Sequence, residues 1–192
     1  GRNILVIPKI SRENGRFCIY SYKKNYDIKE LSKYLFMGNR YSISGQYSHF
    51  AEEKISQHSL LNEIYPKCVH TVKIWTLKIP DKGPLIFAAV LRIGTDLSGV
   101  DNFENHGNLA AAINMKDGRV GECVNYFGER NITRHPLTNK VISGIRLPFW
   151  KNIKKLALFL ADCCEGVNFV GWDIAITDKG PLVIEGNIAP DF

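Results

Sequence analysis

The C-terminal segment of the chain places the strongest constraint on its fold. Two runs rich in apolar residues, 171–177 and 181–187, flank an Asp-Lys-Gly break at 178–180. Such a break between two apolar runs is typical of a β-hairpin with a short glycine-containing loop. Strand residues alternate between two faces. One face of this hairpin is therefore expected to hold core residues: Trp172, Ile174, Ile176, Leu182 and Ile184.

The other face of the hairpin predicts a cation site. With a three-residue loop, Thr177 pairs with Pro181, and this register places Asp173 opposite Glu185. Asn187 shares their face because it lies two residues beyond Glu185. Two carboxylates roughly 5 Å apart repel each other unless a cation lies between them, and oxygen ligands suit Mg²⁺. The predicted metal ligands are thus Asp173, Glu185 and Asn187; the alternative is a solvated polar face.

A second hairpin is expected to supply positive charge. Two longer strands, 69–79 and 84–94, are predicted with the four residues between them as the loop. That register pairs Lys73 with Val90 and puts Arg92 on the same face as Lys73, one diagonal step away. Both side chains project from otherwise apolar strands. We interpret them as cations that neutralise a transferring phosphoryl group, the alternative being solvent-facing charges on an antiparallel sheet.

The remaining elements follow from periodicity and turn residues. Helical spacing predicts an amphipathic helix over 150–163, packed behind the terminal hairpin. Other expected elements are strands at 4–8, 16–22, 49–55, 109–115 and 119–126, a helix over 27–37 and a short helical turn at 62–65.

Composition excludes several classes of protein. Lysine and arginine exceed aspartate and glutamate by 25 − 19 = 6, but these charges are scattered, so no nucleic-acid stripe is expected. No apolar run approaches the ~20 residues of a membrane span, and no signal peptide is recognisable. The five cysteines lack C-x-x-C spacing. A reduced, cytoplasmic protein is the simplest interpretation.

The terminal string GWDIAITDKGPLVIEGN resembles the metal-binding end of the ATP-grasp fold. The chain is most similar to the sugar-transfer-associated ATP-grasp family, found near polysaccharide and glycosyltransferase genes. Further strings that fit this family occur in the expected order: FAEEKI at 50–55, QH at 57–58, YP at 65–66, TVKI at 71–74, AVLRIG at 89–94, VDNF at 100–103, HPLT at 135–138 and LPFW at 147–150. One departure is HTVK at 70–73, where the family usually has Asn-Thr-x-Arg. Lysine there keeps the charge but loses the bidentate fork.

The resemblance implies an α+β fold, the C-terminal portion of an ATP-grasp fold with antiparallel sheets and flanking helices. Residues 1–57 would be the remainder of the first subdomain, on the lid and adenine-hinge side. Residues 58–192 would form the second subdomain with the metal-binding hairpin. In such folds a glycine-rich loop and two nucleotide-binding lysines come before the point where this chain starts. We therefore expect a piece of a longer protein that is inactive by itself.

The resemblance also assigns the cofactors, ATP and one or two Mg²⁺. Glu53, Lys54 and Ile55 would form the adenine hinge, mainly through backbone groups, and His58 would reach the ribose. The alternatives are a plain edge strand and an ordinary surface histidine. Asp101, which follows a Ser-Gly turn, would shape the acceptor pocket or serve as a cap.

The activity implied is that of an ATP- and Mg²⁺-dependent ligase. It would phosphorylate a carboxylate and let an amine or similar nucleophile displace the phosphate. The expected substrates are small or sugar-linked carboxylates in sugar or polysaccharide modification. The alternatives are a kinase acting on a hydroxyl and a catalytically silent module that binds nucleotide or polysaccharide.

Overall fold

The computed structural model divides the chain into two compact units, Gly1–Lys54 and Ile55–Phe192. It describes residues 10–13, 16–19, 24–26, 51–53, 55–95, 101, 103, 107–188 and 190. The expected strand 4–8 and the expected helix 27–37 lie outside the described residues.

The first unit contains a four-stranded sheet in the order β3-β2-β1-β4. Its strands are β1 (Ile10–Glu13), β2 (Arg16–Ile19), β3 (Lys24–Tyr26) and β4 (Ala51–Glu53). β1 pairs antiparallel with β2 but parallel with β4. The expectation of antiparallel sheets therefore needs one correction in this unit, because two strands from distant parts of its sequence run in the same direction.

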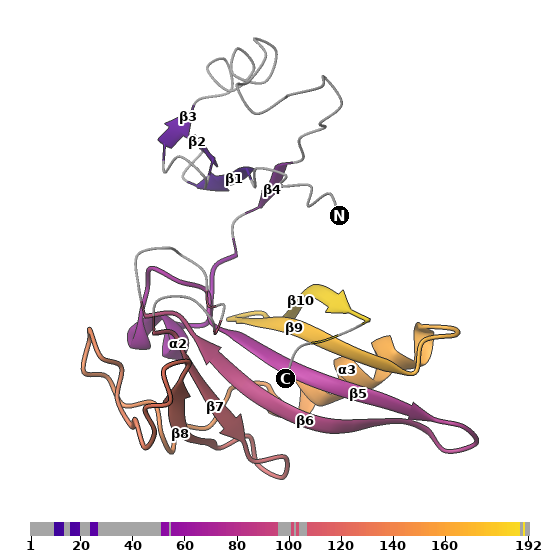
Figure 1. The fold of residues 1–192 in the computed structure, drawn as a ribbon. Helices are drawn as coiled ribbons and strands as arrows, with labels where there is room; N and C mark the ends of the chain where they lie inside the picture. Colours follow the sequence, from indigo (N-terminus) through magenta and orange to yellow (C-terminus); the bar gives the residue numbers. More distant parts are fainter. Residues whose placement is uncertain are drawn as a thin grey trace, which may run out of the picture. The chain divides into compact units, whose positions relative to one another are not determined.

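The second unit is built on a six-stranded sheet in the order β10-β9-β5-β6-β7-β8 (Figure 1). Every neighbouring pair in this sheet is antiparallel. Its strands are β5 (Thr71–Ile79), β6 (Gly83–Ile93), β7 (Leu109–Ile113), β8 (Val120–Asn125), β9 (Phe169–Thr177) and β10 (Gly180–Asn187). A short helix, α2 (Ser59–Ile64), precedes β5, and α3 (Trp150–Cys163) precedes β9. The α+β class is as expected.

The terminal hairpin has a tighter turn than the sequence suggested. Thr177 pairs with Gly180, so the connection has two residues, and Gly180 takes the positive φ of 125° that glycine tolerates. A β-bulge between Val183 and Glu185 then adds one residue to β10. The bulge offsets the shorter turn, and Asp173 does lie opposite Glu185.

The same compensation occurs in the hairpin of β5 and β6. Ile79 pairs with Gly83 rather than with Pro84, so this turn is also one residue shorter than expected. A register shift after Trp75 restores the pairing of Lys73 with Val90. The functional registers in both hairpins were therefore predicted correctly, although the turns were not.

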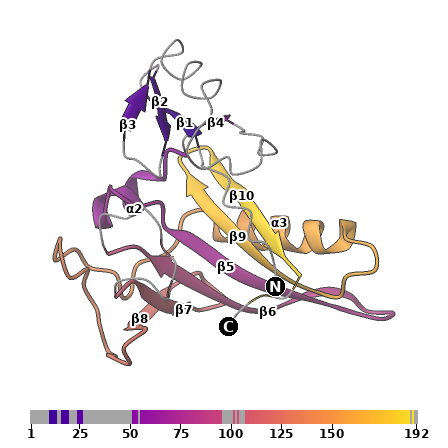
Figure 2. The same cartoon turned by 45° about the horizontal axis from the view of Figure 1, so that its top comes forward.

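Helix α3 packs against one face of the sheet, along β5, β6, β9 and β10 (Figure 2). Its apolar stripe of Trp150, Ile153 and Ala157 is buried there, as its helical periodicity predicted. The sheet residues in this core include Val72, Ile74, Leu91, Trp172, Ile174 and Ile176. Because side chains alternate along strands, the intervening residues point to the opposite face, where the site lies.

Two residues of β10 do not join this core. Leu182 and Ile184 were expected beside Trp172, but they are 46% and 37% exposed, and Val183 packs against the core instead. The short turn shifts the alternation of β10 by one residue, and Glu185 returns to the site face only after the bulge. Gly186 lies against the Trp172 indole: a Cβ there would be 2.5 Å from its Cζ3 atom. Glycine at this position lets the ring pack beneath the bulged strand.

Candidate functional site

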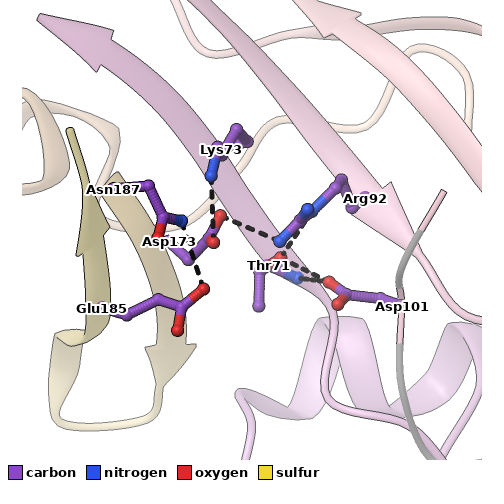
Figure 3. A network of polar contacts seen from close by, with 7 residues as sticks. All are labelled: Thr71, Lys73, Arg92, Asp101, Asp173, Glu185 and Asn187. Carbon is purple, nitrogen blue, oxygen red and sulfur yellow. Dashed lines mark hydrogen bonds and ion pairs between the residues drawn. The ribbon is translucent and has the colours of Figure 1, made fainter. Parts of the chain in front are cut away.

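A row of charged side chains crosses the site face of the second unit's sheet. Glu185 on β10 pairs with Asp173 on β9, and Asp173 pairs with Lys73 on β5. Arg92 on β6 belongs to the neighbouring row, where it pairs with Thr71. The four charged residues predicted from two separate hairpins therefore meet on one face, because β5 and β9 pair with each other (Figure 3).

Asp173 is the centre of this cluster. Its Oδ2 atom accepts a hydrogen bond of 3.1 Å from Lys73 Nζ, and its Oδ1 atom lies 2.9 Å from Arg92 Nη2 in an ion pair. The side chains of Asp173, Lys73 and Arg92 are 4%, 6% and 20% exposed. Burial raises the pKa of the Asp173 carboxyl, a hydrogen bond with Glu185 acts in the same direction, and the charges of Arg92 and Lys73 oppose both. Burial outweighs the two cations, so the pKa of Asp173 lies above its usual value.

A glycine makes room for this arrangement. Gly171 precedes Asp173 by two residues on the same face of β9. A Cβ built on Gly171 would be 3.0 Å from Lys73 Cε and 2.5 Å from Pro190 Cβ. The absence of a side chain at Gly171 thus lets the Lys73 stem lie across β9 and reach Asp173.

The outer edge of the cluster is open to solvent. Glu185 is exposed, and its Oε1 atom accepts a hydrogen bond of 3.2 Å from Asn187 Nδ2. The predicted proximity of Glu185 and Asn187 is therefore present. Of the three expected metal ligands, Asp173 is already bound to cations of the protein, whereas Glu185 and Asn187 lie at the exposed end of the row.

The donor set of this edge fits Mg²⁺. The described residues contain no cluster of three or more His, Cys, Asp and Glu side chains that could hold a metal by themselves. Mg²⁺ does not need such a cage, since it is usually held by one or two carboxylates together with substrate phosphates. Glu185 and Asn187 would hold the ion at the exposed edge, with Asp173 behind them. Their role as ligands stays a prediction.

Two further polar residues extend the network beyond Arg92. Asp101 Oδ2 accepts hydrogen bonds from the Thr71 backbone N–H, at 2.9 Å, and from the Thr71 hydroxyl. Arg92 Nε donates to the same hydroxyl at 3.4 Å. Burial raises the pKa of Asp101, while the Arg92 charge and the Thr71 hydrogen bonds lower it. Thr71 was not predicted as a site residue, although it matches the threonine of the family's Asn-Thr-x-Arg and the pairing of Lys73 with Val90 implies that it lies opposite Arg92.

The expected nucleotide-binding residues lie in a different segment. Glu53 is the last residue of β4, Lys54 lies outside the described residues, and Ile55 is half-buried in the connection that follows. His58 caps α2, since its Nδ1 accepts from the Leu60 N–H at 3.1 Å. Its backbone N–H donates to Ile176 O at 2.7 Å, which ties this connection to β9. Their adenine and ribose contacts stay predictions.

Comparison with protein families agrees with the geometry of the site. A family model described as sugar-transfer associated ATP-grasp matches residues 1–192. The chain belongs to this family. No curated protein and no solved structure matches the chain significantly.

Membership in the ATP-grasp family implies ATP binding and ATP-dependent, ligase-type activity. The family typically uses ATP together with Mg²⁺, an ion that prefers oxygen ligands such as carboxylates. None of the helices among the described residues is long and apolar enough to cross a membrane.

The ATP-grasp chain carries an unusual residue next to its site. His70 is fully buried immediately before β5, and its Nδ1 atom accepts a hydrogen bond of 3.3 Å from the Gly94 N–H. His135 Nε2 lies 3.0 Å from Gly94 O, so two histidines hold the end of β6. Burial, with a smaller effect of His135, lowers the pKa of His70 from 6.5 to about 3. His70 is therefore neutral in the folded protein at ordinary pH.

This buried histidine predicts a specific loss of stability in acid. Below pH 6.5 the unfolded chain protonates His70 but the folded chain does not, so its contribution is complete above pH 6.5 and falls as the pH drops toward 3. At pH 5 the loss is about 2 kcal/mol. His70→Asn is expected to remove this part of the pH dependence, as measured by urea unfolding at pH 7 and pH 5. An equal difference between the two pH values in wild type and variant would contradict the assignment.

Proposed function

We propose that the full-length protein is an ATP- and Mg²⁺-dependent ligase that activates a carboxylate as an acyl phosphate. The carboxylate would be a small molecule or part of a sugar, and the product would serve sugar or polysaccharide modification. An amine or a similar nucleophile would then take up the activated acyl group. We place this activity in the cytoplasm, in agreement with the odd number of cysteines and their lack of disulfide spacing.

The reaction transfers groups in two balanced steps. A carboxylate oxygen attacks the γ-phosphorus of ATP, and the bond from that phosphorus to the β–γ bridging oxygen breaks, so ADP leaves with the electron pair. The amine then attacks the acyl carbon. The bond between this carbon and the phosphate oxygen breaks, inorganic phosphate leaves, and the nitrogen loses a proton.

The residues of the site would act by charge and position. Lys73 and Arg92 would neutralise the phosphoryl group and the carboxylate that approaches it, since both reactants are anions. Glu185 and Asn187, with Asp173, would hold Mg²⁺, which supplies charge neutralisation at the ATP phosphates when bound. Asp173 would also hold the two cations in place before substrates arrive. Residues 53–55 and His58 would contact the nucleoside.

One observation carries this proposal: two carboxylates and two cations from four strands are placed on one face, although Lys73 and Asp173 are 100 residues apart in sequence. A structural ion pair needs only one cation for Asp173. A second cation, half-buried at Arg92, with a further carboxylate at the open edge, is an arrangement suited to an anionic substrate with its metal ion.

Hydroxylamine trapping tests the chemistry directly. The full-length protein is incubated with ATP, Mg²⁺, hydroxylamine and a panel of uronic acids and amino acids. The nucleophile hydroxylamine converts an acyl phosphate to a hydroxamate, which gives a coloured complex with ferric ion. We expect hydroxamate and ADP in equal amounts with at least one carboxylate of the panel, and neither product when Mg²⁺ is removed by chelation.

Two other outcomes would favour the alternatives. Release of ADP with formation of an alkali-stable phosphate ester, and without hydroxamate, would indicate a kinase acting on a hydroxyl. ATP binding without any ADP release across the panel would indicate a catalytically silent nucleotide-binding module.

A further inference from the structure

The direction of the Arg92 guanidinium is fixed from two sides. On one side Nη2 lies 2.9 Å from Asp173 Oδ1, and on the other side Nε donates to Thr71 Oγ1 at 3.4 Å (Figure 3). A guanidinium is planar, so two contacts at different nitrogens determine both its position and its plane. The Thr71 contact therefore decides where the remaining N–H groups of Arg92 point.

The Thr71 hydroxyl can accept a hydrogen bond from Arg92 because it donates its own hydrogen to Asp101. A hydroxyl has one hydrogen to donate and two lone pairs that accept. The Thr71 hydroxyl donates to Asp101 Oδ2, and the Thr71 backbone N–H donates to the same oxygen at 2.9 Å. The lone pairs of Oγ1 are thereby turned toward Arg92 Nε.

Burial stabilises the hydrogen bonds that connect Asp101, Thr71 and Arg92. Thr71 and Asp101 are 4% and 7% exposed, so water does not compete strongly for their hydrogen bonds. Asp101 also places a negative charge behind Arg92, on the side away from Asp173. The cation is thus held between two carboxylates, one in direct contact and one acting through a hydroxyl.

We propose that Asp101 and Thr71 are positioning residues, which orient the Arg92 guanidinium for the phosphoryl group and its acceptor. This inference rests on the proposed function, because it assigns Arg92 a role in the transition state. Neither positioning residue needs to touch a substrate. Their contribution is to keep Arg92 in place when Asp173 also interacts with a bound metal ion and its contact with Arg92 weakens.

The kinetic test uses the full-length protein and Mg²⁺-dependent ATP turnover. Thr71→Val keeps the shape of the side chain but removes the hydroxyl, whereas Thr71→Ser keeps it. We expect Thr71→Val to lower kcat roughly tenfold or more with the KM for ATP within about threefold, as small misplacements of a catalytic group do. Asp101→Asn should lower kcat in the same direction, and Thr71→Ser should stay within about threefold of wild type on the same scale.

A double-mutant comparison separates positioning from general damage. Arg92→Lys removes the Nε donor, so in that background Thr71→Val still breaks the hydrogen bond to Asp101 but no longer breaks one to Arg92. We expect the double variant to have nearly the same kcat as Arg92→Lys alone. A loss equally large in the Arg92→Lys background would overturn the proposal, since it would show that Thr71 acts independently of Arg92.

A second measurement does not depend on turnover. In the ¹H–¹⁵N spectrum the Arg92 Nε–H signal, identified by its disappearance in Arg92→Lys, should exchange slowly with water in wild type and in Thr71→Ser. In Thr71→Val it should exchange roughly tenfold faster or more. Equal exchange in Thr71→Val and wild type would overturn the positioning contact. Absence of ATP turnover in wild type with a protected Nε–H would overturn the proposed function alone.

Discussion

Asp173→Asn is expected to lower the free energy of unfolding by about 3 kcal/mol. The substitution keeps the size of the side chain but removes its charge. Lys73 and Arg92, with side chains 6% and 20% exposed, would then lack the carboxylate that both contact. Removing one partner of a buried ion pair costs more than the pair contributes, because the remaining charges stay desolvated.

Urea unfolding of wild type and variant at pH 7 measures this effect. Asp162→Asn is a matched control, because Asp162 is an exposed carboxylate on α3, and its change should stay within about 0.5 kcal/mol. In a Lys73→Met background, Asp173→Asn should lower the free energy of unfolding by less, since one of the two cations that contact Asp173 is absent. Equal stability of Asp173→Asn and wild type would show that the three charges are not coupled.

This expectation differs from the one that the sequence alone supports. From the hairpin, Asp173 and Glu185 form a repelling pair, so either neutral variant should leave the unliganded protein level or more stable. The structure changes the expectation for Asp173 only. Its two cations come from β5 and β6, and the pairing of β5 with β9 joins residues 100 positions apart. Local patterns cannot specify which distant hairpins become neighbours in a sheet.

The register near the site was predicted correctly because two one-residue differences cancel in each hairpin. In the hairpin of β9 and β10, the turn is one residue shorter than expected and a bulge adds one residue back. Burial of Ile174 and Ile176 places Asp173 on the opposite face of β9, and Glu185 shares that face because the short turn and the bulge cancel in β10. The apolar pattern of β10 did not indicate the position of the bulge, and the exposure of Leu182 and Ile184 was therefore not predicted.

The hydrogen bonds that connect Asp101, Thr71 and Arg92 show a different limit of prediction from sequence. Thr71 could be placed opposite Arg92 from the hairpin, and it matches the threonine of the family's Asn-Thr-x-Arg, but neither observation predicts its hydrogen bonds to Asp101 and Arg92. Asp101 lies 30 residues from Thr71 and between two strands, so its contact depends on tertiary structure. The sequence contains the three residues but does not predict that the Thr71 hydroxyl connects Asp101 with Arg92.

Glu185→Gln is expected to abolish most activity while leaving the fold intact. Glu185 is exposed at the open edge of the row, pairs with Asp173 across the strands and is hydrogen-bonded to Asn187. Glutamine can keep the contact with Asn187, and the loss of a charge beside Asp173 relieves repulsion, so urea unfolding should give a stability equal to or above that of wild type. Mg²⁺-dependent ATP turnover of the full-length protein should fall at least ~10²-fold, the scale of lost transition-state charge stabilisation.

Two comparisons make this prediction decisive. Glu122→Gln neutralises an exposed glutamate on β8 of the same sheet and should keep wild-type turnover. Mn²⁺ binding in the presence of ATP, followed by electron paramagnetic resonance, should weaken roughly tenfold or more in Glu185→Gln alone if this carboxylate is a ligand. Turnover of Glu185→Gln within a few-fold of wild type at saturating Mg²⁺ and ATP would falsify the metal assignment. The exposed end of the row would then be an ordinary polar strand edge, and the buried charges behind it would serve the fold only.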